Sequence, residues 1–465
     1  MSRQPKHKPS LTTRLAGLTK IKFVRDTLVL QLGSVVQSGT YFVTSVLTAR
    51  SLGDEQLGRW ATARELYMFI FFMVSMGLTN AAVSSYSKAR GQDDREAATL
   101  ALAALLKLGL IVSLLAAVFG VLLAPRLAEA LYDGDREVGV ITAILCFGCL
   151  GEVLRSLTLA VLSGARQMKR YVAFDALTNL LRLGLVGGAL LIERTPEAVA
   201  VALLSHALLS GALGLVAYQR AGRLHETTAP PPFREVLTQV PRAPLRQMLG
   251  TSSLLAAGKA MNNIVPRLPL ILIPALAVST SEGFADNGAF QVAMVLNMVL
   301  AGVVGAIGTN LLPTLGFKMG QADVPMEQLG ATLRKVSLAA GAFTAGATLV
   351  SLPAAYVVLK VFYGEEFDGA FPLFWRLASG NLVLGFCVIV EPWAIYAHQL
   401  RKHVARNVVL ALLIASCVYW ATANFGAQGA ALAAGLARAA ALVHMLFIWL
   451  WFRRRRPLSG DTHPA

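Results

Sequence analysis

The stretch from Gly250 to Val278, GTSSLLAAGKAMNNIVPRLPLILIPALAV, is long and apolar enough for a helix that crosses a lipid bilayer. It nevertheless carries Lys259, Asn262, Asn263 and Arg267. Lys259, Asn263 and Arg267 are spaced i, i+4 and i+8, so they share one face of the helix. A charge at the bilayer centre costs roughly 2.5 to 3.5 kcal/mol. We therefore predict that this face lines a water-accessible cavity and forms the substrate site.

The same stretch is predicted to be deformable and to hold one charge near the bilayer midplane. Pro266, Pro269 and Pro274 predict that its second half is bent or broken. Lys259 lies about eleven residues into the span and thus on the order of 16 Å deep. At that depth its ammonium cannot easily reach the headgroups, so Lys259 is the strongest cavity-lining candidate.

The whole chain has the composition of an all-α polytopic membrane protein. It has 465 residues, 55% of them hydrophobic, and apolar runs recur from Leu28 to Phe452. The net charge of +16 comes mostly from Lys and Arg in alternate connections, where they orient spans, so no nucleic-acid partner is indicated. The basic start of the chain lacks a cleavable signal pattern. All four cysteines fall in apolar runs, which predicts neither disulfides nor redox chemistry.

Twelve apolar spans can be counted along the chain. Their approximate limits are 26–48, 61–84, 98–123, 138–163, 171–192, 197–218, 248–277, 287–314, 330–360, 371–397, 404–423 and 428–452. Every second connection is rich in Lys and Arg, whereas the intervening ones are neutral or acidic. Because cytoplasmic loops favour Lys and Arg, this alternation predicts twelve spans with both termini in the cytoplasm.

The longest connection divides the chain almost in half. We expect a basic cytoplasmic tail at 1–25, an N-lobe of six spans at 26–218, a cytoplasmic linker at 219–247, a C-lobe of six spans at 248–452 and a second basic tail at 453–465. Within the linker, Phe233, Val236, Leu237 and Val240 have helical spacing. Two alternatives remain for this helix, which either lies on the membrane surface or packs against the lobes.

The two halves show an internal repeat. Placing Gly58 over Gly288 aligns the second span with the eighth without a gap. The identical pairs are Ala63/Ala293, Leu66/Leu296, Met68/Met298, Val74/Val304, Thr79/Thr309, Asn80/Asn310 and Lys88/Lys318. Since each half has an even number of spans, the two lobes are predicted to be parallel and related by an axis along the membrane normal. This architecture suits alternating access about a central site.

Several ionisable residues lie in other spans. Glu152 and Arg155 are at i, i+3 and are predicted to pair on one helix face, in packing or in gating. Glu391, next to Pro392, is consistent with either a coupling proton or a salt bridge between lobes. His206 is expected to be a satisfied core residue. The chain has no phosphate-binding Gly-rich loop, metal-ligand spacing or nucleophile elbow, so we predict no catalytic residues, no metal site and no ATP hydrolysis.

Three segments resemble a known family. LTARSLGDEQLGRWA (Leu47 to Ala61), MGLTNAAVSSYSKARG (Met76 to Gly91) and SGARQMKRY (Ser163 to Tyr171) resemble bacterial polysaccharide-export flippases, the Wzx-type O-antigen transporters. These belong to the multidrug/oligosaccharidyl-lipid/polysaccharide exporter (MOP) superfamily, which also contains multidrug extruders and the fourteen-span lipid II flippase. The resemblance is clearest over the first 175 residues, and its best element is L-G-x-x-x-x-G from Leu52 to Gly58.

The resemblance implies a transporter, and not an enzyme, in the bacterial cytoplasmic (inner) membrane. Its implied task is to flip polyprenyl-diphosphate-linked oligosaccharide to the outer leaflet for cell-surface polysaccharide biosynthesis. The implied partners are this glycan, the bilayer and polysaccharide assembly proteins. An interior-negative potential gains about 2.3 kcal/mol per negative charge per 100 mV. No cofactor is expected, and coupling to H⁺ or Na⁺ is compatible with this transport without being required.

On this interpretation the intramembrane polar residues take three roles. The cations that would hold the diphosphate are Lys259 and Arg267, with Arg64 or Arg155 opposite. The amides that would hydrogen-bond sugars are Asn262, Asn263, Asn80, Asn310 and Gln37. The carboxylates that would serve in coupling or gating are Glu391, Glu65 and Glu152.

Two alternative functions remain. A multidrug or organic-cation antiporter of the same superfamily would share the fold, but its cavity should be acidic and aromatic, whereas the second and seventh spans are net basic. A membrane polysaccharide polymerase or glycosyltransferase would need a sizeable outer loop with clustered ionisable residues, and the outer loops are short.

The predicted midplane charge can be tested directly. The Lys259→Ala variant should insert normally but lose transport of diphosphate-linked glycan, because its cavity would lack the cation that offsets headgroup desolvation. Headgroup translocation in reconstituted vesicles is the measurement. Unchanged transport would remove Lys259 from the site.

Overall fold

The computed structural model describes residues 22–165, 167–222, 230–243, 265–298, 326–387 and 400–440, with a few single positions besides. Regular structure in these ranges is helical throughout. The helices of the first half are α2 (Lys22–Gly91), α3 (Arg95–Leu122), α4 (Ala124–Leu131), α5 (Glu137–Phe147), α6 (Cys149–Gly164), α7 (Met168–Ile192) and α8 (Pro196–Gly222), followed by α9 (Phe233–Gln239).

The second half is more broken than the first. Its elements are η1 (Val265–Arg267), α11 (Pro269–Leu276), a helix over 280–298, α13 (Met326–Val358), η2 (Leu359–Tyr363), η3 (Glu365–Phe367), α14 (Ala370–Ser379), α15 (Asn381–Leu384), η4 (Gly385–Cys387), α17 (Leu400–Ala437) and η5 (Arg438–Ala440). The predicted break in the seventh span is confirmed from residue 265 onward. There a 3-10 turn precedes α11, which itself contains Pro274.

The apolar helices match the predicted spans, with one correction. Six described helices are long and apolar enough to cross a membrane, and α5 with α6 makes a seventh span. The sequence predicted one uninterrupted span at 138–163, but α5 and α6 meet at Gly148 with a bend of 41°. Near this bend, α6 approaches α8 so closely that a Cβ on Gly151 would lie 2.1 Å from the Ala207 carbonyl oxygen. Small residues permit this close helix packing.

Two long helices are broken at glycines that lie between predicted spans. The first two predicted spans both lie in α2, which breaks at Gly53 with φ +77°. Similarly, α17 breaks at Gly426 with φ +57°, between the eleventh and twelfth predicted spans. Only glycine adopts such left-handed φ values without strain, so each break is encoded by its residue.

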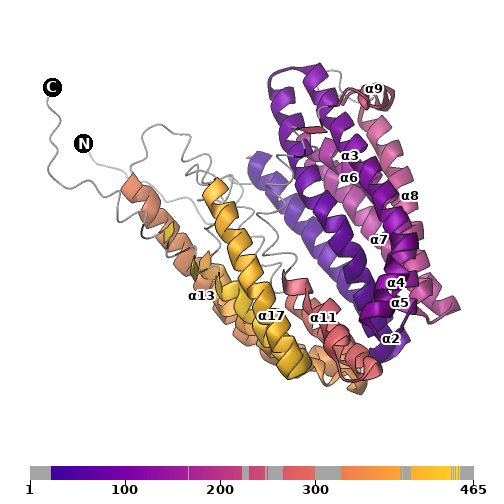
Figure 1. Ribbon diagram of the computed structural model, residues 1–465. Helices are drawn as coiled ribbons and strands as arrows, with labels where there is room; N and C mark the ends of the chain where they lie inside the picture. Colours follow the sequence, from indigo (N-terminus) through magenta and orange to yellow (C-terminus); the bar gives the residue numbers. More distant parts are fainter. Residues whose placement is uncertain are drawn as a thin grey trace, which may run out of the picture.

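The helices form two bundles that converge at one end (Figure 1). One bundle contains α2 to α8, and the other contains α11, α13 and α17. They meet where α11 contacts α2, where Gly53 lies beside Glu366 and where Thr280 contacts Asp133, and they diverge toward the end at which α9 lies. We call the meeting region, defined by Gly53, residues 132–136, residues 277–281 and residues 364–369, the closed end.

The two halves cross at the pair of glycines that the internal repeat aligned. A Cβ on Gly58 would lie 1.8 Å from the carbonyl oxygen of Phe284, and a Cβ on Gly288 would lie 2.1 Å from that of Asp54. Each glycine therefore packs on the carbonyl four residues before the other. This reciprocity is what two similar halves related by a two-fold axis produce. Asn287 strengthens the crossing, since its Nδ2 donates to Thr62 Oγ1 at 2.8 Å.

The described part of the linker packs against the first half. Val236 of α9 is fully buried in a cluster with α3, and the Tyr218 hydroxyl donates to the Pro231 carbonyl at 2.6 Å. Glu235 pairs with Arg95 at 2.9 Å. Of the two alternatives for this helix, packing against the protein is thus the one observed.

Candidate functional site

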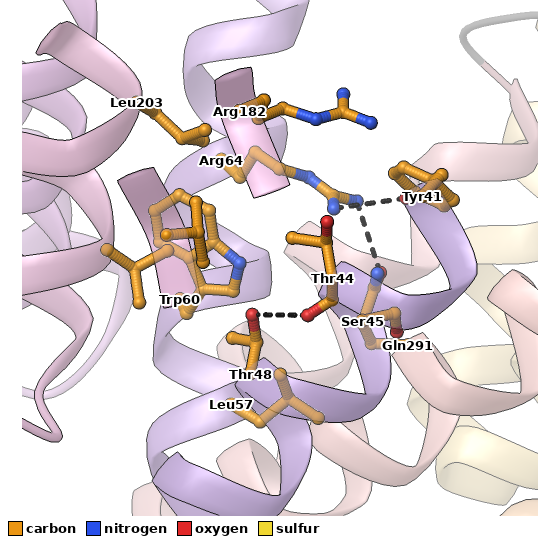
Figure 2. Close-up of a pocket in the computed structure, with 12 residues that line it drawn as sticks. Tyr41, Thr44, Ser45, Thr48, Leu57, Trp60, Arg64, Arg182, Leu203 and Gln291 are labelled. Atoms are coloured by element: carbon orange, nitrogen blue, oxygen red, sulfur yellow. Dashed lines mark hydrogen bonds between the residues drawn. The ribbon is translucent and has the colours of Figure 1, made fainter. Parts of the chain in front are cut away.

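A small pocket with a mostly apolar lining and a few polar groups lies among α2, α7, α8 and the helix over 280–298 (Figure 2). Its lining residues are Tyr41, Thr44, Ser45, Thr48, Leu57, Trp60, Arg64, Arg182, Val186, Val199, Leu203 and Gln291. The cavity volume is about 90 Å³. That is room for several water molecules, and it is smaller than the roughly 300 Å³ at which ligand pockets begin. In this conformation the pocket can therefore hold water but not a whole glycan headgroup.

Arg64 connects the pocket to both halves of the molecule. It lies six residues beyond Gly58 on α2, where the crossing brings that helix beside the helix over 280–298. Its Nη1 donates to the Tyr41 hydroxyl at 3.3 Å, and its Nη2 donates to Gln291 Oε1 at 3.2 Å (Figure 2). Gln291 belongs to the second half, so these contacts hold the Arg64 guanidinium inside the protein.

An ion pair next to the pocket joins the two halves. Glu65, only 2% exposed, receives Arg64 Nη2 at 2.7 Å. Arg267 Nη1, from η1 of the second half, lies 2.9 and 2.8 Å from the two oxygens of the same carboxylate. The broken backbone after residue 264 thus presents a cation to a buried acid of the other half.

Arg182 is a pocket residue that the sequence-based site did not include. Its Nε and Nη2 are buried and have no hydrogen-bond partner among the described residues, and its guanidinium lies 5.5 Å from the centre of the Tyr41 ring. A cation in the middle of the apolar helix α7 was the available signal. Arg64 and Arg267 share one buried carboxylate, Glu65, while Arg182 lines the pocket beside them, so two guanidinium groups have a single carboxylate as their partner there.

Arg155 lies in a separate network inside the first half. Its Nε donates to Glu152 at 3.0 Å and its Nη1 to Asp175 at 3.2 Å. The predicted pairing of Glu152 with Arg155 is confirmed. His206 contacts the Thr178 carbonyl at 3.0 Å and is buried, as expected of a satisfied core residue. Arg155 is not among the residues that line the pocket.

The second half has its own buried polar cluster, which the sequence did not reveal. Arg438 donates to the side chains of Asn381 and Asn297, and Asn381 Nδ2 lies 2.7 Å from Asn297 Oδ1. These contacts hold η5 against α15 and the helix over 280–298. The cluster therefore organises the second bundle.

Of the other predicted site residues, Gln37 is the one whose side chain the structure describes, and it does not line the pocket. Gln37 lies on an exposed part of α2. Asn80 belongs to α2, but its side chain is outside what the structure describes. The remaining candidates lie outside the described residues: Lys259, Asn262, Asn263, Asn310 and Glu391. Of the predicted diphosphate ligands, Arg64 and Arg267 are therefore the two that the structure brings together.

The chain matches a known protein family and the fold of several solved structures. The model of a family described as polysaccharide biosynthesis protein matches residues 23–316. No curated protein sequence matches the chain. The match to solved structures is to transporters, and it extends over nearly the whole chain.

Three solved structures illustrate the match. An inward-facing multidrug resistance MATE family transporter of the MOP superfamily has TM-score 0.66 and 15% identity, with 92% of this chain and 100% of that chain covered. Its outward-facing counterpart has TM-score 0.63 and 15% identity, covering 97% and 98%. A mutant of the Vibrio cholerae MATE transporter VcmN has TM-score 0.62 and 15% identity, covering 96% and 99%. The predicted all-α polytopic fold with two six-helix lobes is therefore confirmed.

Proposed function

The chain belongs to the polysaccharide biosynthesis protein family of the MOP superfamily, and we propose that it flips a polyprenyl-diphosphate-linked oligosaccharide across a bacterial cytoplasmic membrane. The cargo would move from the inner to the outer leaflet by alternating access of the two halves. Family membership and the transporter fold support transport, and the site supports the class of cargo.

The observation that carries the proposal is the surplus of cations where the halves meet. Arg64 and Arg267 share one carboxylate, Glu65, and Arg182, which lines the same pocket as Arg64, retains N–H groups with no partner among the described residues. Guanidinium groups match phosphate oxygens in planar, two-point hydrogen bonds. A diphosphate that leaves the lipid surface loses hydration, and buried cations offset that cost. The polyprenyl tail can remain in the bilayer throughout.

The two bundles diverge at the end from which cargo of the inner leaflet would enter. Acidic residues concentrate at the closed end, among them Asp54, Glu55, Glu365 and Glu366, whereas Lys88 and Arg90 lie at the opposite end of α2. The distribution of Lys and Arg orients the closed end outward and the diverging end, with both chain termini, toward the cytoplasm. The headgroup would then enter between the bundles from the cytoplasmic side.

The pocket gives less support to an organic-cation antiporter. Such a cargo needs an acidic group that is free to bind it, but Glu65 is already shared by two arginines. The outward movement of about two negative charges through 100 mV would gain roughly 4 to 5 kcal/mol. Coupling to H⁺ or Na⁺ is therefore an addition that this proposal does not need.

Arg182 provides the test of the proposed cargo class. The Arg182→Gln variant should reduce headgroup translocation at least about tenfold, because a hydrogen bond to a charged group contributes roughly 1.5–3 kcal/mol. The measurement is transport of polyprenyl-diphosphate-linked oligosaccharide in reconstituted vesicles. Arg126→Gln is the matched control, since Arg126 is exposed on α4 away from the pocket. Equal transport by the two variants would contradict a diphosphate site at this pocket.

A further inference from the structure

In the Glu65–Arg267 ion pair, the Glu65 carboxylate already binds the guanidinium that an anionic cargo would need. Arg267 Nη1 reaches both oxygens of Glu65, and the carboxylate is almost fully buried while the Arg267 side chain remains 27% exposed. Arg267 is thus the accessible member of the pair. A ligand that enters along the interface between the halves can approach it without first uncovering Glu65.

The two partners of Glu65 differ in what happens when the halves move. Arg64 is its neighbour on α2 and travels with it, whereas Arg267 belongs to the other half. The crossing at Gly58 and Gly288 lies only two helical turns from Glu65, so separation at the closed end must pull Arg267 away. After separation Glu65 keeps one arginine, and Arg267 is left without a counterion from this pair.

We propose that Glu65 is an internal competitor of the transported anion, and that the cargo releases the closed end by replacing Glu65 at Arg267. This inference rests on the proposed function. A diphosphate carries enough charge and enough acceptor oxygens to pair with Arg267 in two-point geometry. Neutral and cationic molecules cannot make this exchange. Glu65 is therefore a specificity-determining residue that couples opening to the negative charge of the cargo.

Three exposed contacts at the closed end differ from this buried ion pair. Asp54 N–H donates to Glu366 Oε1 at 3.1 Å, Thr280 donates to Asp133 at 2.9 Å, and Arg50 donates to the Val361 carbonyl at 2.8 Å. All three are exposed, so water can replace either partner when the halves part. The buried Glu65–Arg267 pair has no such ready substitute, and its rupture requires a ligand that restores the charge balance.

The experiment measures separation of the closed end with two spin labels. The labels are placed at Glu129 on α4 and Glu282 in the second half, both exposed at the closed end, in protein whose exposed Cys417 is replaced by alanine. Distance distributions are recorded by pulsed electron resonance in lipid nanodiscs, with and without farnesyl diphosphate as the anionic probe. Glu65→Gln is compared with Glu55→Gln, which removes a carboxylate that pairs with Arg59 within one helix.

The expected result is a change in the ratio of open to closed populations. Without the probe, Glu65→Gln should raise this ratio at least about tenfold, because a neutral amide holds Arg267 far less strongly than a carboxylate does. Farnesyl diphosphate should raise it in the unmodified protein and add little in Glu65→Gln. Glu55→Gln should behave like the unmodified protein.

Two results would overturn the inference, and they are separable from failure of the proposed function. Suppose that Glu65→Gln has the same spin-label distances as the unmodified protein while diphosphate-linked glycan is still transported. Then the Glu65–Arg267 pair does not hold the closed end together, although the proposed function stands. If Glu65→Gln opens the closed end but the probe never does so in the unmodified protein, then the anion does not compete with Glu65. Absence of glycan transport by the unmodified protein would instead refute the proposed function.

Discussion

Gly58→Ala should keep the two halves from closing and should lower transport by at least about tenfold. The added Cβ would lie 1.8 Å from the backbone carbonyl oxygen of Phe284, and neither helix can relieve that contact by a side-chain rotation. The crossing must widen by more than 1 Å, which typically costs about 1–3 kcal/mol in a well-packed interface. Since alternating access requires this end to close in each cycle, loss of the closed state stops transport.

The reciprocal glycine provides an internal check of this prediction. Gly288→Ala should act in the same way, because its Cβ would lie 2.1 Å from the Asp54 carbonyl oxygen. The double variant should be much less than additive, since either substitution alone already separates the same crossing. Gly184→Ala on α7 is the matched control, because a Cβ there meets nothing within 4 Å. Cross-linking across the closed end and vesicle transport are the two measurements. If Gly58→Ala matches Gly184→Ala in both, the crossing is not a required contact.

Arg155→Ala should destabilise the first half by about 3–5 kcal/mol, the usual effect of removing one partner from a buried charge pair. Glu152 and Asp175 both contact Arg155, and both are largely buried. Without the guanidinium, two neighbouring carboxylates would remain inside the bundle and repel one another. The measurement is the free energy of unfolding in detergent, and the midpoint temperature should fall with it.

Neutral replacements separate charge balance from packing at this site. A triple variant with Arg155→Met, Glu152→Gln and Asp175→Asn should recover most of the lost stability, because the two carboxylates that contact Arg155 are no longer left charged without it. The stability of Arg155→Lys should lie between those of Arg155→Ala and the triple variant, since lysine retains the charge but loses the planar two-point geometry. If Arg155→Ala unfolds at the same temperature as the unmodified protein, the network does not contribute to stability.

The features that the sequence predicted well depend on local chemistry. Pro266 lies in the 3-10 turn and Pro269 begins the short helix α11, so the break in this span falls where prolines disfavour a continuous helix. Glu152 and Arg155 are one helical turn apart, so their pairing needed no knowledge of the fold. The repeat that aligned Gly58 with Gly288 likewise required only self-comparison, although it did not reveal that the two glycines pack on each other.

The features that the sequence did not predict depend on which helices become neighbours. Arg64 and Glu65 lie near a span end, a position from which long side chains usually reach water. The glycine crossing instead brings the second half over them and buries the carboxylate. Arg182 lines the pocket because α7 packs beside α2, and no local spacing encodes that contact. Likewise, the bend at Gly148 accompanies the close approach of α6 to α8.

The reciprocal glycine crossing joins the second and eighth predicted spans, which are similar in sequence but differ in charge. In the register that superposes Gly58 on Gly288, Arg64 and Glu65 fall opposite Met294 and Val295. The glycine crossing is thus built from both copies of this span, whereas the charged Arg64–Glu65 pair has no counterpart at the aligned positions of the other copy. Substitutions at Arg64 and Glu65 would therefore change the charge beside the crossing and leave the glycine contacts themselves intact.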